Sequence, residues 1–187
     1  DDVLDPKQSD QGRVLSTRHL QQRVEREQQA IRQAVEDLSG DTVEHVAVDG
    51  CGAPVMSISL AGLARSFGRI AAAGEGPEKT VGDAMREHPQ YVGGTRREVT
   101  QLMRAVPGSI AKDGAESVYA AGLADGRGVA VKVADGAPFS RARRGLLAHA
   151  LLALGADTPG LRELADQPVL GHGRPVGAVE VLDLRTA

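Results

Sequence analysis

The stretch SIAKDGAESVYAAGLADGRGVAVKV, residues 109–133, decides the fold. It contains three short apolar runs, 109–112, 116–123 and 128–133, separated by Asp113-Gly114 and Asp125-Gly126. Asp-Gly between apolar runs is typical of a β-hairpin turn, because both residues tolerate the positive φ that such turns need. The sequence therefore predicts three antiparallel strands joined by two hairpin turns.

Helical patterns flank this stretch on both sides. Apolar residues from Leu20 to Leu38 recur at spacings of three, four and seven, which is typical of an amphipathic helix. Helices are predicted at 20–38, 59–73, 78–87, 95–106 and 140–155, and further strands at 43–48 and 175–184. Hairpins that follow a run of helices favour an α+β fold, with an antiparallel sheet flanked by helices, over a doubly wound parallel sheet.

The chain length suits one domain, because 187 residues are too few for two comfortable ones. Residues 1–18 lack periodicity and are predicted to form a loose N-terminal segment, and 19–187 are predicted to be the folded region. The chain does not open on Met, which indicates processing or one piece of a longer polypeptide.

The amino-acid composition of the chain argues against several functional classes. Acidic residues outnumber basic ones 25 to 22 and aromatic residues make up 2%, which argues against nucleic-acid binding. No run of about 18 apolar residues is present to cross a membrane, and the acidic first residues do not resemble a signal peptide. The single cysteine rules out a disulfide within the chain, and a cytoplasmic protein is predicted.

Cys51 directly follows a predicted strand and has a glycine on each side. Flanking glycines let the backbone bend sharply and push the thiol outward, where it could ligate a metal or act as a nucleophile. A lone cysteine is more often a small buried apolar residue. Zinc needs about four ligands, and the five histidines show no metal-site spacing, so a metal here would need ligands from outside this chain. Asp49 could bind a substrate ammonium or, as the favoured alternative, cap the turn.

Lys112 stands at the end of a predicted strand and is followed by Asp113-Gly114. Serine amidohydrolases of the penicillin-recognising kind place a Lys-Thr-Gly triplet in this way, with a small residue that lets the substrate approach. An ordinary exposed lysine is an equal alternative. The stretch from Ser109 to Lys112 also reads Ser-x-x-Lys, but residues three apart on a strand point to opposite faces, so this match is interpreted as accidental.

Six strings occur in an order and spacing similar to the asparaginase II family, the thermolabile rhizobial type. They are Asp49–Pro54, His88–Gly94, Leu102–Gly108, Lys112–Glu116, Gly128–Gly136 and Arg141–Arg143. The resemblance covers roughly residues 19–184. It implies a fold similar to that of serine β-lactamases and glutaminases, and hydrolysis of L-asparagine to aspartate and ammonia.

The resemblance also implies roles for individual residues. In the family, a serine in a Ser-x-x-Lys helix is the nucleophile, a second serine lies nearby, and a lysine comes from a Lys-x-Gly strand. A zinc held by two cysteines and a lysine lies beside the site. Lys112 matches the lysine of the strand, Cys51 matches the second zinc cysteine, and Asp49 matches the acidic residue beside it. Asp49 and Gly114 are then expected to contact the substrate, and a homodimer is compatible with the resemblance.

The sequence departs from the family pattern in two ways. The Ser-x-x-Lys helix, the second serine and the Cys-Ser-Gly-Lys-His zinc segment of the family do not occur here in the right context, and they are expected upstream of Asp1. The middle residue of the Lys-x-Gly triplet is Asp113, where relatives have a small hydroxylated residue. A negative charge beside Lys112 favours the ammonium form, which a general base must shed.

The sequence thus predicts the C-terminal portion of an asparaginase-type amidohydrolase that is inactive as the isolated chain. The alternative is a non-catalytic amino-acid-binding or interaction module on the same scaffold, which would keep a pocket around Asp49 and Lys112. A third hypothesis makes Ser109 or Cys51 a local nucleophile.

Overall fold

The computed structural model describes residues 17–134, 136 and 141–182, with the backbone alone at 17–21 and 141–144. The chain divides into two compact units, residues 1–34 and 35–187. The long helix α1, Thr17–Ser39, runs through the first unit into the start of the second. Within it, Arg23 and Glu27 form an exposed i,i+4 ion pair at 2.9 Å. The predicted loose segment, residues 1–18, lies outside the described residues except for its last two, which begin α1.

A three-stranded antiparallel sheet forms the centre of the second unit, in the order β3–β4–β5. Its strands are β3, Ile110–Asp113, β4, Val118–Gly122, and β5, Gly128–Lys132. The register pairs Lys112 with Ala120 and Ala120 with Ala130. The α+β class and the three antiparallel strands predicted from residues 109–133 are therefore confirmed.

The two hairpin turns differ from each other in where the positive φ falls. The second turn follows the prediction, because Gly126 has a φ of 90° and Asp125 Oδ1 accepts from the amide of Arg127 at 3.1 Å. In the first turn, Asp113 is still in β3, and the positive φ values belong to Glu116 (54°) and Ser117 (57°). The positive φ values of the first turn thus lie three residues later than Asp-Gly predicts, because strand pairing extends through Asp113.

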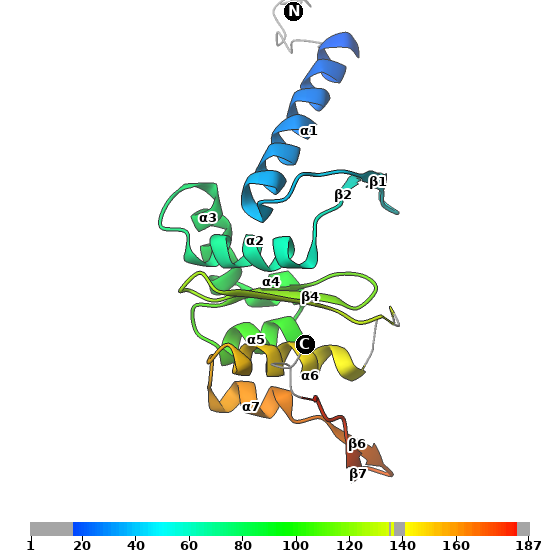
Figure 1. Ribbon diagram of the computed structural model, residues 1–187, viewed down its shortest axis with the longest axis vertical. Coiled ribbons are helices and arrows are strands. Elements are labelled where there is room, and N and C mark those ends of the chain that lie inside the picture. The colour runs from blue at the N-terminus through cyan, green and yellow to red at the C-terminus, as the bar shows by residue number, and fades with distance from the viewer. Residues whose placement is uncertain (1–16, 135, 137–140, 183–187) are drawn as a thin grey trace, which may run out of the picture. The chain divides into compact units, whose positions relative to one another are not determined.

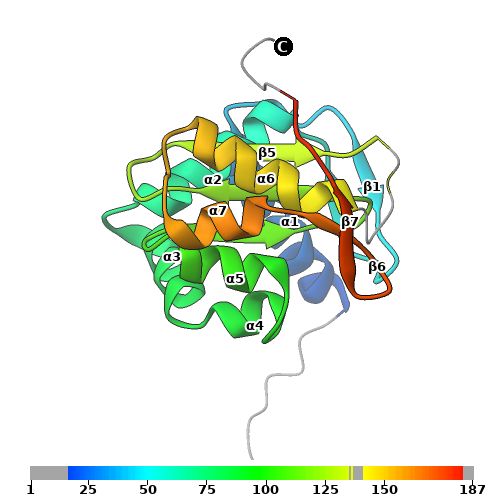
Figure 2. The same cartoon turned by 90° about the horizontal axis from the view of Figure 1, so that it is seen from below.

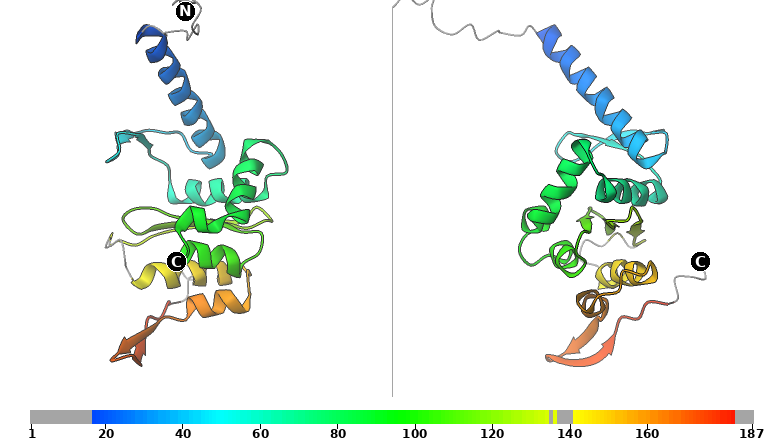
Figure 3. Two further views of the ribbon diagram at one scale, coloured as in Figure 1. Left: turned by 180° about the vertical axis from the view of Figure 1, so that it is seen from behind. Right: turned by 90° about the vertical axis from the view of Figure 1, so that its left-hand side faces the viewer.

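Helices cover both faces of this sheet. One face carries α2, Leu60–Ala72, which contacts β4 and β5, and α3, Gly76–Glu87, packs beside α2 (Figure 1). The other face carries α5, Glu98–Ala105, and α6, Arg141–Ala153, with α7, Pro159–Ala165, packed on both of them (Figure 2). The edge-on view in the right panel of Figure 3 shows this order of layers.

The main core lies between the sheet and α5, α6 and α7. Because strand side chains alternate between faces, Ala111, Tyr119 and Ala121 all point into this core. Their partners from the helices include Val99, Leu102, Met103, Leu147, Leu151 and Leu161. Burial of these side chains, each typically worth about 1.5–3 kcal/mol for a large aliphatic residue, holds β3 firmly against α5.

Glycines allow α2 to lie unusually close to the opposite face. A Cβ atom at Gly122 would stand 2.0 Å from the carbonyl oxygen of Phe67, and one at Gly128 would stand 1.9 Å from that of Ala64. Gly68 of α2 likewise has the carbonyl oxygen of Gly126 where its Cβ would be, at 2.2 Å. Close contact between helix and strand backbones therefore requires residues without a side chain at these positions.

Two small hairpins and one short helix are the remaining elements of the described residues in this unit. The hairpins are β1, Val46–Val48, with β2, Pro54–Met56, and β6, Pro168–Gly171, with β7, Arg174–Ala178. β2, β6, α7 and the five-residue helix α4, Pro89–Gly93, were not predicted, and the strand predicted at 175–184 ends at Ala178. Among the described residues, no helix is both long enough and apolar enough to span a membrane.

Candidate active site

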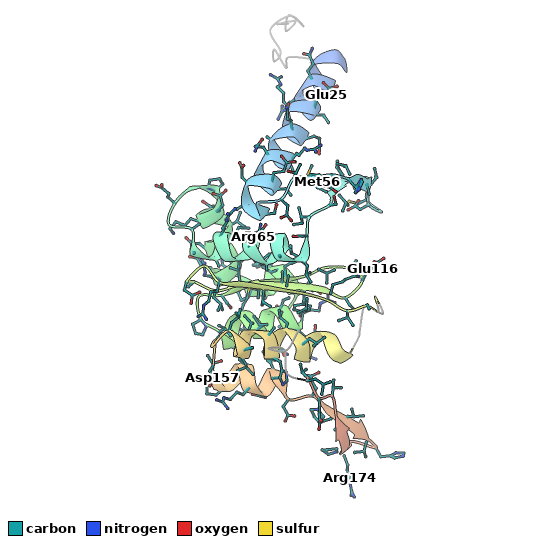
Figure 4. The ribbon with its side chains drawn as sticks, viewed as in Figure 1. Glu25, Met56, Arg65, Glu116, Asp157 and Arg174 are labelled. Carbon is teal, nitrogen blue, oxygen red and sulfur yellow. The ribbon has the colours of Figure 1, made fainter. Side chains whose placement is uncertain are left out.

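Lys112 lies one residue before the end of β3, with its side chain half-exposed between two buried neighbours, Ala111 and Asp113. The alternation of strand side chains explains this pattern, because Ala111 and Asp113 point toward the core under α5. The strand-end position predicted for Lys112 is therefore present. Glu116 marks the turn that follows, at one end of the sheet (Figure 4).

The carboxylate of Asp113 is held by two cations. Lys112 Nζ donates to the carbonyl oxygen of Asp113 at 2.5 Å and to Oδ1 of its carboxylate at 3.1 Å. Arg97 Nη2 donates to Oδ2 of the same carboxylate at 2.6 Å. The Asp113 side chain is only 4% exposed, whereas those of Arg97 and Lys112 are each 49% exposed. A buried anion thus anchors two cationic groups that reach the surface.

The charges of this cluster set the ionisation of Asp113. Burial by itself would raise the pKa of Asp113, but the hydrogen bond and charge of Lys112, together with Arg97, lower the pKa below the ordinary value of 3.8. Asp113 is therefore a carboxylate at neutral pH. Its negative charge lies against Lys112, as the sequence predicted from their adjacency.

Arg97 is a functional candidate that the sequence did not reveal. It occupies the N-cap position of α5 in an extended conformation, with φ −74° and ψ 154°. Packing of α5 against β3 brings its guanidinium to Asp113, 16 positions further along the chain. The only hint in the sequence is a pair of arginines before a helix, and such a pair predicts no partner.

Gly114, the predicted contact for substrate, closes the β3–β4 turn. Its amide donates to the carbonyl oxygen of Val118 at 2.9 Å, so its N–H group is already used within the hairpin. The residue is exposed. Across the same turn, Lys132 donates to the carbonyl oxygen of Glu116 and lies 3.6 Å from its carboxylate. This second lysine fixes the turn from β5.

Asp49 and Cys51 lie together in the exposed turn between β1 and β2. Asp49 Oδ1 accepts from the amide of Cys51 at 2.9 Å and from that of Ala53 at 3.0 Å. Hydrogen bonding from Cys51 and from the Ala53 amide lowers the pKa of Asp49 below its ordinary value. Asp49 therefore caps the turn, which was the favoured alternative. Cys51 is exposed, which excludes the buried apolar role, and its side chain hydrogen-bonds with the Asp49 carboxylate.

The predicted site residues form two clusters, Asp49 with Cys51 and Lys112 with Asp113, each on its own hairpin. The β1–β2 hairpin and the turn at Glu116 extend toward the same side of the second unit (Figures 1 and 4). In the described part of the chain, no hydrogen bond joins the Cys51 thiol to the Lys112 ammonium. The turns thus share a side of the fold without direct contact between these two groups.

Ser109 is not paired with Lys112. Its hydroxyl is buried and donates to the carbonyl oxygen of Val106 at 2.7 Å, while the ammonium of Lys112 donates to Asp113. The interpretation of Ser-x-x-Lys as accidental is therefore confirmed. A nucleophile needs a base within hydrogen-bond reach, and no side chain among the described residues offers one to the Ser109 hydroxyl.

Zinc is the cofactor that the family resemblance implies. Among the described residues, no group of three or more His, Cys, Asp or Glu side chains lies close enough to hold a metal ion. Cys51 is a suitable single thiolate, but a structural zinc is almost always four-coordinate. The described residues alone therefore do not fit a zinc site.

Comparison with known proteins identifies the family of this chain. Residues 12–181 match the L-asparaginase II family, so the chain belongs to this family. No curated protein matches the chain significantly. Family membership supports an asparaginase-type amidohydrolase acting on a small molecule.

Proposed function

We propose that this chain supplies the lysine-bearing strand end of an L-asparaginase whose attacking serine lies outside these 187 residues. The observation that supports it is the position of Lys112, half-exposed at the end of an antiparallel strand in a chain of this family. Serine amidohydrolases with a Lys-x-Gly strand place their lysine at an equivalent strand end.

The proposed reaction proceeds through an acyl-enzyme. The serine oxygen attacks the side-chain amide carbon of L-asparagine and its proton passes to the leaving nitrogen, so that ammonia departs and an ester remains. Water then cleaves the ester, restores the serine and releases L-aspartate. Lys112 would hold the negative charge that develops on the substrate, or relay protons near the serine.

In this proposal, Asp49 and Cys51 form a neighbouring part of the site. The Asp49 carboxylate is exposed and accepts hydrogen bonds within its own turn. In this proposal its negative charge would also attract a substrate ammonium. Cys51 would supply one zinc thiolate, with the remaining ligands contributed by residues outside this chain. No step of the reaction above passes through zinc.

Ammonia release from L-asparagine by the purified chain tests the proposal. We expect no turnover above the uncatalysed rate, because Ser109 is buried and unpaired with Lys112. Robust turnover by the 187 residues would sink the idea of a missing nucleophile. In that case Ser109→Ala and Cys51→Ala would show whether either residue is a local nucleophile.

A complementary experiment separates the enzyme from the non-catalytic module. If the preceding reading frame encodes Ser-x-x-Lys and Cys-Ser-Gly-Lys-His, a fusion of that segment to this chain should hydrolyse L-asparagine. Lys112→Ala in the fusion should abolish turnover. If the preceding reading frame encodes no such segment, and this chain binds L-asparagine without hydrolysing it, the non-catalytic binding module is favoured instead.

A further inference from the structure

We propose that Arg97 and Lys112 together form a carboxylate-binding site, in which the buried carboxylate of Asp113 fixes both cations. This inference rests on the proposed function and assigns the end of the amino-acid substrate that the cluster binds. Neither the six family-like strings nor the predicted site residues include Arg97.

Arg97 has more hydrogen-bond donors than Asp113 uses. A guanidinium has five N–H donors in a rigid fork that matches the two oxygens of a carboxylate. In the described part of the chain, Arg97 uses only Nη2, toward Asp113, and its side chain is 49% exposed. The Nε and Nη1 donors are therefore available to a ligand that approaches from water.

Lys112 adds a second donor to the same place. Two of its three ammonium hydrogens are directed at the backbone and side chain of Asp113, which leaves one for a ligand. Arg97 and Lys112 contact different oxygens of one carboxylate, Oδ2 at 2.6 Å and Oδ1 at 3.1 Å. Their cationic groups are thus held side by side by a fixed anion.

The charge and burial of the cluster favour an anionic ligand. Two cations and one carboxylate sum to +1, and the carboxylate is shielded from water while both cations reach it. Glu98, next to Arg97, has its carboxylate 3.5 Å from the hydroxyl of Tyr119, a core residue. Bidentate pairing with an arginine is about twice as strong as a neutral hydrogen bond. The fitting ligand class is a small carboxylate, such as the α-carboxylate of L-asparagine or the product L-aspartate.

Binding of L-aspartate to the 187-residue protein tests the site. We expect NMR titration of ¹⁵N-labelled protein to give saturable shifts of the amide of Gly114, and Arg97→Gln to weaken the affinity by about tenfold or more. Arg104→Gln is the matched control, because Arg104 is an exposed arginine of the same helix, and it should leave the affinity unchanged. Propionamide, which has an amide but no carboxylate, should cause no shifts.

A double variant keeps the test valid if loss of Arg97 alone disturbs the fold. The double variant Arg97→Gln, Asp113→Asn removes both charges of the ion pair at once, and it should also bind L-aspartate weakly. Affinity equal to wild type in this variant, or no saturable L-aspartate binding by the wild type, would overturn the inference.

Two results separate this inference from the proposed function. If succinate binds through Arg97 but the fusion with an upstream serine segment does not hydrolyse L-asparagine, the carboxylate site stands and the asparaginase proposal fails. If that fusion hydrolyses L-asparagine with the same KM after Arg97→Gln, the asparaginase proposal stands and the carboxylate site fails.

Discussion

Arg97 Nη2 lies 2.6 Å from the buried carboxylate of Asp113, so that a helix N-terminus and a strand end 16 positions apart are joined by one ion pair. Asp113 in turn accepts from Lys112, its neighbour on β3. The half-exposed lysine is therefore anchored from α5 as well as from its own strand. One buried carboxylate thus links two half-exposed cations at this end of the sheet.

Removing Arg97 should destabilise the protein, because the buried carboxylate of Asp113 loses one of its two partners. We expect Arg97→Gln to lower the free energy of unfolding by about 1–3 kcal/mol at neutral pH, measured by urea denaturation. Arg104→Gln removes an exposed arginine from the same helix, and its free energy of unfolding should stay within about 0.5 kcal/mol of wild type. Equal stability of the two variants would contradict a structural ion pair.

The same pair predicts a pH dependence of stability. The pKa of Asp113 is lower in the folded protein than its ordinary value of 3.8. Its contribution to stability is therefore complete above that ordinary value and is lost as the pH falls through the lower folded value. The stability difference between wild type and Asp113→Asn should shrink over that acid window, as urea denaturation at a series of pH values would show. A difference that persists at the acid end would argue against a carboxylate role.

The Asp49 turn should respond to acid in the same direction. Hydrogen bonds from Cys51 and Ala53 lower the pKa of Asp49, so the turn is held above the ordinary carboxyl value and loosens as the pH falls through the folded value. The amide resonances of Cys51 and Ala53 should shift together in an NMR pH titration. Asp49→Asn keeps an acceptor oxygen without a charge, so these shifts should vanish in that variant.

A side chain at Gly122 should disrupt the contact between α2 and the sheet. The added Cβ would lie 2.0 Å from the carbonyl oxygen of Phe67, a backbone atom that cannot move alone. We expect Gly122→Ala to lower the free energy of unfolding by about 1–3 kcal/mol or more, measured by thermal unfolding. Gly177→Ala is the control on another strand, since nothing lies within 4 Å of its Cβ position. Similar melting of both variants would show that α2 is not packed this closely.

Tight zinc binding is not expected from this chain alone. The exposed sulfur of Cys51 offers a single ligand, and the described residues contain no cluster that could complete the site. Competition with a chromophoric chelator should give a weak affinity that Cys51→Ser hardly changes. Stoichiometric zinc that resists the chelator and disappears in Cys51→Ser would contradict this prediction.

Local sequence was sufficient where local forces decide the structure. The turn at Gly126 follows Asp-Gly, and Ser59 caps α2 by accepting from the amide of Gly62 at 2.9 Å, at the predicted start of that helix. Both features depend on residues within four positions of one another. The location of Lys112 near a strand end was also predicted from local sequence, because Asp113-Gly114 follows the apolar run at 109–112.

Predictions failed where neighbours distant in sequence decide. Residues 159–165, where no helix was predicted, form α7, and Leu161 of this helix is buried in the core against α5 and α6. The first hairpin turn falls on Glu116 and Ser117, since Asp113 pairs with Tyr119 across the sheet and continues β3. At this hairpin, strand pairing outweighed the local turn preference of Asp113-Gly114.

The sequence by itself determined the class of the fold, the strand that carries Lys112 and the family strings around it, because periodicity and turn residues act over a few positions. Only the tertiary structure decided that Arg97 reaches Asp113, that Asp49 serves its own turn, and that Ser109 turns away from Lys112. An arginine before a helix can pair with any carboxylate within reach, and the packing of α5 on β3 selects which one.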